Sequence, residues 1–416
     1  MSKALTPSEQ AAAMTVPPLP KGYQLGGVYC GIKRYADKLD LSLIVSDRPA
    51  TAAGVYTTNL VFAAPVKWDR AHTPNESIRG IIINSGNANA CTEERGDADC
   101  KRMAELAAAA CGASADQMLV LSTGIIGEFM PIAKIEAGVK DVAGKLGTDE
   151  ASLVAAARGM LTTDTRHKVA GRTLKLSSGT VQIAGLAKGA AMIGPKMATM
   201  LGVVLTDAAL TSADAQRMLA AEVEDSFNCI SVDGHMSTND TVLLLANGAA
   251  GGPTLSSPVL SGADLATFQA ALREVLGELA RMIPADGEGA THLVQVEVRG
   301  AKDRESARSL AKSVSESLLV KTAICGADPN WGRIVSAAGY ANIPFDPAKV
   351  DLWVNDIHLY HNGAPLGFDR VAASHSIRDH RDTHILLTFG EGSGTVKFWT
   401  TDLTAEYVRL NADYHT

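Results

Sequence analysis

Residues 185–201 of this 416-residue chain read Gly185-Leu-Ala-Lys-Gly-Ala-Ala-Met-Ile-Gly-Pro-Lys-Met-Ala-Thr-Met-Leu201. A strand-like run enters this segment, a turn with glycine and proline occupies its middle, and a second apolar run follows Met200. Thr199 therefore stands at the start of a predicted buried strand. A reactive hydroxyl is out of place there unless the peptide bond before it is cut.

Cleavage before Thr199 would turn this residue into an N-terminal nucleophile. Its α-amino group, whose pKa is typically about 8, can then take the proton of its own hydroxyl. One residue would supply both the nucleophile and the general base. The sequence also allows a plain alternative, in which Thr199 is a β-branched strand residue with no chemical role.

The composition is that of a core-forming chain with a slight acidic excess. Lys and Arg number 38 against 45 Asp and Glu, so the formal net charge is −7. This balance offers no excess of cations for a nucleic-acid backbone. No stretch approaches the roughly 18 consecutive apolar residues of a membrane span, and residues 1–22 lack the apolar core of a signal peptide. We therefore expect a cytoplasmic protein without nucleic-acid or membrane partners.

Short strand-like runs alternate with amphipathic helical segments along the chain, which predicts a layered α/β body with substantial sheet. Apolar periodicity predicts helices at 97–110, 264–282 and 306–319, and one starting near residue 211. Glycine-rich segments at 248–253 and 390–394 are candidate domain boundaries. Strand-like runs occur at 39–45, 80–84, 180–186, 201–205, 241–245, 293–298, 350–354 and 384–389.

The usual signatures of cofactor and metal enzymes are absent from the sequence. It contains no G-x-x-x-x-G-K-[ST], no G-x-G-x-x-G between strand and helix, and no H-E-x-x-H. The six cysteines include no C-x-x-C pair, and histidines at 375–384 have no Cys or carboxylate spacing that completes a zinc site. His358 and His361, three apart on a predicted strand, are expected on opposite faces. We therefore expect no bound metal.

Eight blocks of sequence, in order, resemble the ornithine acetyltransferase family, also called the bifunctional glutamate N-acetyltransferase and amino-acid acetyltransferase of arginine biosynthesis. The central block, Lys188 to Leu201, resembles the self-cleavage signature of that family. The other seven are Asn84-Ser-Gly-Asn-Ala-Asn-Ala-Cys-Thr92, Ser122-Thr-Gly-Ile-Ile-Gly127, Thr162-Thr-Asp-Thr165, Ser231-Val-Asp-Gly-His-Met-Ser-Thr-Asn-Asp-Thr241, Asp286-Gly-Glu-Gly-Ala-Thr291, Gly326-Ala-Asp-Pro-Asn-Trp-Gly-Arg333 and Tyr407-Val-Arg-Leu-Asn-Ala-Asp-Tyr-His-Thr416.

The resemblance implies a layered αββα-type sandwich that cuts itself between Ala198 and Thr199. The α chain (1–198) and the β chain (199–416) would share one catalytic body, and two αβ units would associate as a heterotetramer. Thr199 would be the nucleophile, with the Thr123 hydroxyl and the Gly124 N–H as donors to the oxyanion. The implied substrate contacts are Thr162, Lys188, Thr199, Glu288, Asn411 and Thr416.

The same residues also fit ordinary roles when they are considered without the resemblance. Ser122 to Gly124 has the composition of a strand-end turn, Lys188 could be a solvated lysine, and Glu288 could be a turn glutamate. By default the end of a chain is exposed and mobile. Only the family pattern places Thr416 in the active site.

The resemblance implies an enzyme that moves the acetyl group of N2-acetylornithine to glutamate through a Thr199 acyl-enzyme, with ping-pong kinetics. The products are ornithine and N-acetylglutamate, formed in arginine biosynthesis. No bound cofactor is expected, and acetyl-CoA is a candidate second acetyl donor. Two alternatives stay open: an N-terminal-threonine amidohydrolase or aminopeptidase with water as the acceptor, and a non-catalytic paralogue.

The chain departs from the commonest family pattern at a few positions. None of them removes the nucleophile or a proposed oxyanion donor. Lys196, however, places a cation near the scissile bond, which bears on the rate of processing and on substrate preference. The departures are Lys196 for Asn, Ala190-Ala191 for Ser-Gly, His235-Met236 for Asp-Thr, and His292 for Lys.

Overall fold

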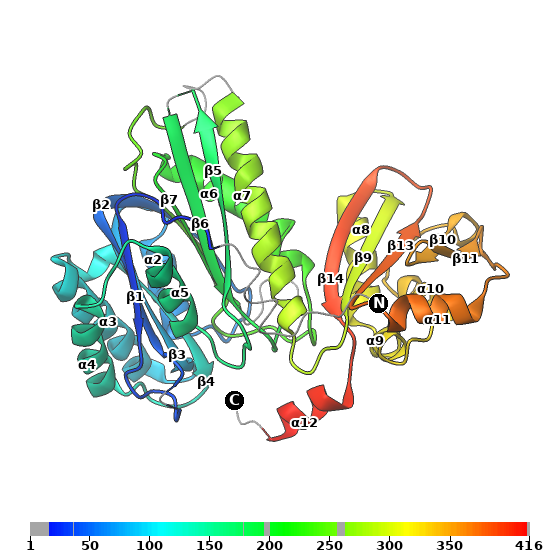
Figure 1. The fold of residues 1–416 in the computed structure, drawn as a ribbon, viewed down its shortest axis with the longest axis horizontal. Helices are drawn as coiled ribbons and strands as arrows, with labels where there is room; N and C mark the ends of the chain where they lie inside the picture. Colours follow the sequence, from blue (N-terminus) through cyan, green and yellow to red (C-terminus); the bar gives the residue numbers. More distant parts are fainter. Residues whose placement is uncertain (1–15, 36, 178, 195–199, 256–262, 414–416) are drawn as a thin grey trace.

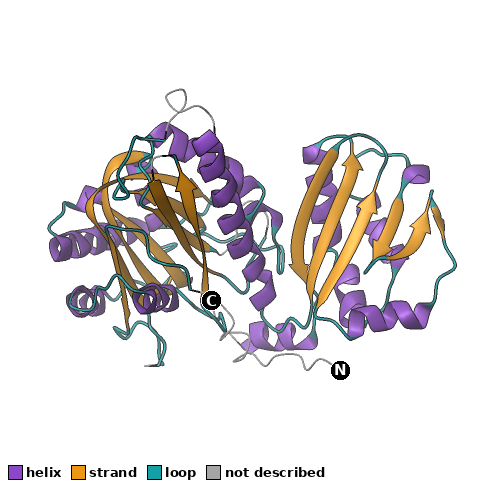
Figure 2. Cartoon of the chain, turned by 45° about the horizontal axis from the view of Figure 1, so that its top comes forward, coloured by secondary structure: helices purple, strands orange, loops and turns teal. Residues whose placement is uncertain are grey.

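The computed structural model describes residues 16–35, 37–177, 179–194, 200–255 and 263–413. They form two lobes, each built on its own sheet, and the chain passes from one to the other after helix α7 (Ala263–Met282) (Figure 1). The last helix, α12 (Ala405–Asp413), leaves the second lobe and lies beneath the junction between the two (Figure 1). Figure 2 shows both sheets with helices packed against them.

The sheet of the first lobe has eight strands and is mixed. Its order is β4-β3-β2-β8-β7-β6-β5, and β1 pairs with β2 beside this path. β3 is parallel to β4 and β7 is parallel to β8, whereas the other neighbouring pairs are antiparallel. The strands are β1 (Tyr23–Val28), β2 (Leu41–Tyr56), β3 (Asn75–Asn87), β4 (Met118–Ile125), β5 (Lys168–Leu176), β6 (Gly179–Lys188), β7 (Leu201–Thr206) and β8 (Thr241–Ala246).

The long strand β2 joins the two halves of this sheet. Its residues 41–45 pair with β1 and β3, the register then shifts, and its residues 51–56 pair with β8. A shift of this kind bends a strand and increases its twist. The half made of β1–β4 and the half made of β5–β8 therefore belong to one hydrogen-bonded sheet but to two different layers.

The buried side chains confirm the layered αββα sandwich. Successive residues of a strand point to opposite faces: Ile81 and Ile83 of β3 belong to one apolar cluster, and Ile82 belongs to another. The first cluster lies between the two halves, because Val203 and Leu205 of β7 are also in it. The outer faces are covered by α2 (Ala64–His72), α3 (Glu93–Cys111) and α4 (Ile132–Ala143) on one half, and by α6 (Ser212–Glu224) and α7 on the other; α5 (Glu150–Gly159) packs into the inner cluster.

The second lobe has a six-stranded sheet of order β12-β11-β10-β13-β9-β14, in which β9 and β13 are parallel. One apolar cluster fills the space between this sheet and its helices. Among the described helices of the chain, none reaches the length and apolar character that a membrane-spanning segment requires. The elements of this lobe are β9 (Leu293–Ala301), α8 (Arg304–Glu316), α9 (Leu318–Cys325), α10 (Trp331–Gly339), β10 (Asp351–Val354), β11 (Ile357–His361), β12 (Ala364–Pro365), α11 (Arg370–Arg378), β13 (Asp382–Thr388) and β14 (Gly394–Thr401).

The candidate boundaries at 248–253 and 390–394 are wrong. The first segment follows β8 within the first lobe, and the second joins β13 to β14 within the second lobe. Glycine-rich segments mark chain reversals inside a domain as readily as borders between domains. The lobes instead meet between α7 and β9, where one short 3-10 helix (Pro284–Asp286) stands.

The expectation that two histidines of β11 point to opposite faces is also wrong. The pairing of β11 with β10 shifts by one residue at Leu359, which makes a β-bulge. Leu359 and Tyr360 both pack against the apolar core of the second lobe. Alternation resumes after them, so that His361 returns to the side of His358, with the two ring centroids 5.4 Å apart.

Candidate active site

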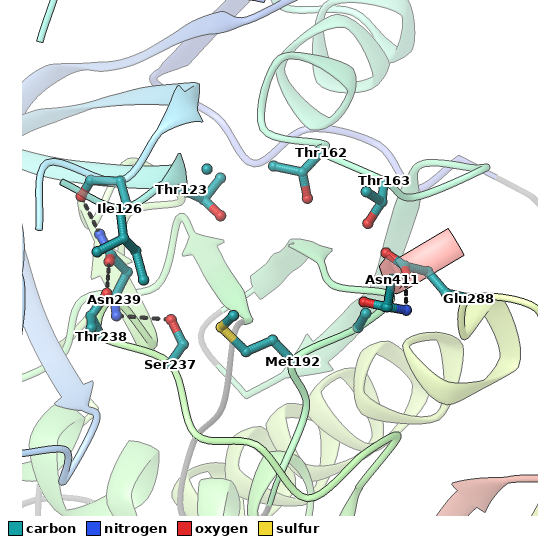
Figure 3. A pocket seen from close by; sticks show the side chains of 13 residues that line it. Thr123, Ile126, Thr162, Thr163, Met192, Ser237, Thr238, Asn239, Glu288 and Asn411 are labelled. Carbon is teal, nitrogen blue, oxygen red and sulfur yellow. Dashed lines mark hydrogen bonds between the residues drawn. The ribbon is translucent and has the colours of Figure 1, made fainter. Parts of the chain in front are cut away.

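A pocket of about 120 Å³ lies where the end of β4 meets the loops before β5 and β8 and the helix α12 (Figure 3). The described residues that the sequence nominated contribute much of its wall, because Thr123, Gly124, Thr162, Glu288 and Asn411 all line it. These residues are far apart in the sequence: they come from the first lobe, from the connection between the lobes and from α12. The other lining residues are Ala88, Ile126, Thr163, Ala191, Met192, Ser237, Thr238 and Asn239.

The end of β4 is held rigidly at the pocket. Gly124 has a φ of 137°, and a Cβ at this position would lie 2.3 Å from the carbonyl carbon of Gly86, so only glycine fits. The side-chain amide of Asn239 donates a hydrogen bond to the carbonyl oxygen of Ser122 at 2.9 Å. These contacts fix the Thr123 hydroxyl and the Gly124 backbone, the two predicted oxyanion donors.

Lys188, the last residue of β6, is 1% exposed. Its Nζ donates to the Thr123 hydroxyl oxygen over a long distance of 3.4 Å. Burial lowers the pKa of Lys188, and the nearby carboxylate of Asp164 offsets part of that effect. The alternative of a solvated surface lysine is therefore wrong, and Lys188 is a buried cation directly behind a pocket-lining hydroxyl.

Asp164, in the loop before β5, holds two predicted substrate-contact segments in place. One of its oxygens accepts from Lys168 Nζ at 2.7 Å and from the Gly189 N–H at 2.6 Å, and the other accepts from the Thr162 N–H at 3.1 Å. Burial alone would raise the pKa of Asp164, but the Lys168 cation and these hydrogen bonds hold it well below its usual range. Lys168 also donates to Asp286 at 2.7 Å, which ties the loop to the junction between the lobes.

Asp240, at the entry to β8, lies beside the segment that contains the predicted nucleophile. Its side chain is buried, and Oδ1 accepts a hydrogen bond from the Met200 N–H at 2.9 Å. Burial raises the pKa of Asp240 to about 8, although the Met200 N–H and the Lys188 cation act in the opposite direction. This carboxyl group therefore keeps a proton near neutral pH. It contacts the backbone of Met200, the residue that follows Thr199 in the chain.

Glu288 and Asn411 form the side of the pocket nearest the second lobe. Asn411 Nδ2 donates to the Glu288 carboxylate at 2.9 Å (Figure 3), and the Glu288 N–H donates to the carbonyl of Ala190 at 2.9 Å. The next residue, Gly289, has a φ of 65°, and a Cβ there would lie 2.5 Å from the backbone nitrogen of Tyr407. Glycine at this position lets α12 approach, so the last helix reaches the pocket.

Thr199 and Thr416, the predicted nucleophile and the predicted terminal contact, lie outside the described residues, as does Ala198. The strands on either side of the predicted cleavage bond are described. β6 ends at Lys188 and β7 begins at Leu201, and these two residues are partners in the antiparallel pairing. The chain thus leaves and re-enters the sheet at one place, directly behind the pocket.

Sequence reasoning did not single out Asp164, Asn239 or Asp240 as site residues. All three stand inside blocks quoted for the family resemblance, within 162–165 and 231–241. A signal was available, because an acid or amide directly before an apolar strand needs a polar partner once it is buried. That pattern occurs where Asn239 and Asp240 precede β8, whose residues after Thr241 are all apolar.

The two histidines that depart from the family pattern, His235 and His292, have different surroundings. His292 is buried and has a partner at each ring nitrogen, since Nδ1 lies 3.2 Å from Asp402 and Nε2 lies 3.2 Å from the carbonyl oxygen of Ile377. His235 is exposed, and its backbone N–H donates to Asp233 at 3.1 Å. Lys196 lies outside the described residues.

Comparisons with known proteins identify the family. Residues 24–416 match the family model described as the ArgJ family. The chain is 45% identical over 398 residues to the arginine biosynthesis bifunctional protein ArgJ of Rhodopirellula baltica, covering 96% of each chain. It is 43% identical over 398 residues to the protein of the same name from Symbiobacterium thermophilum, covering 95% of this chain and 98% of the relative.

Two similar solved structures carry related descriptions. The arginine biosynthesis bifunctional protein of Bacillus halodurans is 40% identical with a TM-score of 0.48, and the match covers 50% of this chain and 96% of that one. The ornithine acetyltransferase of Mycobacterium tuberculosis, complexed with ornithine, is 36% identical with a TM-score of 0.41, covering 44% and 96%. The sequence match over nearly the whole chain confirms the resemblance found in the eight motif blocks: this chain belongs to the ArgJ family.

Proposed function

We propose that this chain is a glutamate N-acetyltransferase of arginine biosynthesis, which transfers the acetyl group of N2-acetylornithine to glutamate. Family membership supports the pathway, because the relatives are named as arginine biosynthesis bifunctional proteins. The observation that carries the proposal to this chain is the pocket itself. It gathers Thr123, Gly124, Thr162, Glu288 and Asn411, which the sequence had nominated separately.

The nucleophile would arise by cleavage of the bond between Ala198 and Thr199. The Thr199 hydroxyl attacks the Ala198 carbonyl carbon, the C–N bond breaks, and an ester with a free α-amino group results. Water then hydrolyses the ester, which leaves the Ala198 carboxylate and restores the hydroxyl. The pairing of β6 with β7 would keep the two fragments in one sheet after the cut.

Turnover would proceed in two acyl transfers at Thr199. Its hydroxyl attacks the acetyl carbon of N2-acetylornithine while its α-amino group takes the hydroxyl proton, and the C–N bond to ornithine breaks as that nitrogen receives the proton. The amine of glutamate then attacks the acetyl ester. N-acetylglutamate leaves, and the hydroxyl of Thr199 regains its proton.

The contact between Lys188 and Thr123 supports the assignment of the oxyanion donors. Lys188 donates to the Thr123 oxygen, so the hydrogen of that hydroxyl is free to point into the pocket. The Gly124 N–H is the second donor of the proposal. Loss of one such donor typically raises a barrier by about 2.7–4 kcal/mol.

The substrates carry a carboxylate, and ornithine also carries a side-chain ammonium, so both need charge partners when they leave water. Glu288 is the anion of the pocket wall and would pair with the ammonium. Lys188 is the buried cation beside the pocket and would pair with a carboxylate. Thr162, Asn411 and Thr416 would supply the remaining polar contacts.

A donor-and-acceptor assay tests the proposal. Purified protein should consume N2-acetylornithine quickly only when glutamate is present, with N-acetylglutamate and ornithine formed in equal amounts. Consumption at the same rate without glutamate, with acetate as the product, would instead establish the amidohydrolase alternative. The same assay with acetyl-CoA in place of N2-acetylornithine tests acetyl-CoA as a second donor, which would match the word bifunctional in the names of the relatives.

Intact-mass measurement tests self-cleavage and the non-catalytic alternative together. Wild-type protein should give two fragments, 1–198 and 199–416, whereas Thr199→Ala should stay a single 43.5 kDa chain and be inactive. A single uncut wild-type chain would support the paralogue alternative, and two fragments from Thr199→Ala would exclude Thr199 as the processing residue. Native mass and cell fractionation test the heterotetramer and the cytoplasmic location, which stay predictions.

A further inference from the structure

The second lobe carries three metal-ligating side chains that the acetyl-transfer site does not use. We propose that Asp351, His358 and His361, here called the hairpin cluster, bind one zinc ion. A ligand atom from each of them lies within 4.8 Å of the ligand atoms of the other two. The hairpin β10–β11 lies on the side of the second lobe that faces away from the first lobe (Figure 1).

The backbone brings the three side chains onto one face. Asn355 and Asp356 join β10 to β11 with φ values of 48° and 66°, the left-handed conformation that a two-residue hairpin turn requires. The bulge at Leu359 then returns His361 to the face of His358. Without the bulge the strand would hold these two imidazoles on opposite faces, so the cluster depends on this local irregularity.

The distances suit a tetrahedral metal after small adjustments. Asp351 Oδ1 lies 2.6 Å from His361 Nδ1 and 3.9 Å from His358 Nε2. Bonds of about 2.0–2.2 Å from zinc to nitrogen and oxygen place the ligand atoms of a tetrahedral site about 3.3–3.5 Å apart. The observed spacings lie on both sides of this value. A metal ion would therefore draw His358 inward and separate Asp351 from His361.

His358 has a buried nitrogen with unused capacity. Its ring stacks on Trp353 with the centroids 4.2 Å apart and the planes 11° from parallel, which fixes its orientation. Its Nε2 is buried and has no hydrogen-bond partner among the residues that the structure describes. Buried polar atoms are normally satisfied, and a metal ion between His358 and Asp351 would satisfy this one.

Asn362 is placed to support the ligands. Its backbone N–H donates to Asp351 Oδ1 at 3.0 Å, and its side-chain amide lies 2.8 Å from His361 Nε2. Metal-bound imidazoles usually hydrogen-bond through their second nitrogen, which fixes the tautomer. With the metal on Nδ1, neutral His361 carries its proton on Nε2, and the Asn362 carboxamide would turn its oxygen toward that N–H.

The ligand set selects the ion. Two imidazoles and one carboxylate suit zinc and the late divalent transition metals, whereas calcium and magnesium prefer oxygen ligands alone. Three protein ligands leave a fourth position for water. The His361 side chain is 48% exposed, so the site has access to solvent and to free metal.

Zinc titration against a chromophoric chelator tests the proposal on untagged, full-length protein stripped with EDTA. Wild type should bind one zinc per chain and unfold at a higher temperature with zinc than without it. His358→Phe keeps a ring on Trp353 but removes the ligand, and it should weaken zinc binding at least about 10-fold. The matched control is His375→Ala, which removes a 56% exposed histidine of α11 and should leave zinc affinity unchanged.

Equal zinc affinity in wild type and His358→Phe would overturn the proposal, as would binding lost equally in His375→Ala. Copper(II) electron paramagnetic resonance gives an independent readout, because two coordinating imidazole nitrogens should be seen in wild type and one in His358→Phe. Acetyl transfer should be unchanged in both variants, which serves as the check that they fold. A wild-type copper spectrum without nitrogen couplings would also exclude the hairpin cluster.

Discussion

Two regions around buried lysines in the first lobe have opposite surroundings. Lys168 Nζ lies between two carboxylates, 2.7 Å from Asp164 and 2.7 Å from Asp286. Among the residues that the structure describes, Lys188 Nζ makes one long hydrogen bond, 3.4 Å from the Thr123 hydroxyl, although it is equally buried. A buried cation with complete partners holds the fold together, whereas one with incomplete partners retains the capacity to bind a substrate anion or to polarise a hydroxyl.

The two regions are coupled through one carboxylate. Asp164 pairs with Lys168 and also accepts from the Gly189 N–H, directly after Lys188. It accepts from the Thr162 N–H as well. Lys168 therefore positions the residues around Lys188, and the fold supplies the rigidity that a precise site needs.

Replacing Lys168 should have the largest effect on stability. Lys168→Met leaves Asp164 and Asp286 buried without their shared cation, and removal of one partner from a buried ion pair typically costs about 3–5 kcal/mol. Urea denaturation of the uncut Thr199→Ala form measures the change in the free energy of unfolding. The control is Lys145→Met, whose exposed i,i+4 pair with Asp141 is worth about 0.5 kcal/mol or less. Equal losses in both variants would contradict the structural role of Lys168.

Replacing Lys188 should have the opposite balance of effects to replacing Lys168: a small loss of stability and a large loss of activity. Lys188→Met removes a side chain with one long hydrogen bond among the described residues, so the free energy of unfolding should change by about 1 kcal/mol or less. Acetyl transfer should fall about 100-fold or more, because the hydroxyl of Thr123 loses the donor that leaves its own hydrogen free for the oxyanion. Steady-state kinetics beside urea denaturation makes the comparison. An active Lys188→Met enzyme, or one destabilised as much as Lys168→Met, would remove the distinction between the two regions.

The sequence predicts the elements better than it predicts these partnerships. Helix α7 spans 263–282 against an expected 264–282, because apolar periodicity is a local property. Motif resemblance likewise nominated the residues that meet in the pocket. Lys168 and Asp286, however, lie 118 residues apart, and no local sequence pattern predicts such a pair. The bulge at Leu359 could not be predicted from the sequence for a related reason, since it depends on the pairing of β11 with β10.

Asp240 should make stability depend on pH. Burial raises its pKa to about 8 in the folded chain, whereas an unfolded Asp titrates near pH 4. Between about pH 4 and 8 the folded chain therefore holds a proton that the unfolded chain releases, so this group's contribution to stability is present below that range and is lost as pH rises through it. Asp240→Asn keeps an acceptor for the Met200 N–H but cannot ionise.

The stability of wild type relative to Asp240→Asn should therefore fall as the pH rises from about 5 to 8 and level off above it. Urea denaturation at each pH, with Thr199→Ala present in both chains, gives the difference directly. Parallel curves across the range would show that the Asp240 carboxyl does not hold a proton in the folded chain.

The smallest effect should come from the rim of the pocket. Asn411 donates to Glu288 at 2.9 Å, and both groups reach solvent. Asn411→Ala removes the hydrogen bond to Glu288, which is worth about 0.5–1.5 kcal/mol, so KM for N2-acetylornithine should rise by a few fold with little change in kcat. Glu288→Gln keeps the acceptor for Asn411 but removes the charge, and it should raise KM for the cationic donor more than KM for glutamate. Equal changes in KM for both substrates would show that the charge of Glu288 does not select the cationic donor.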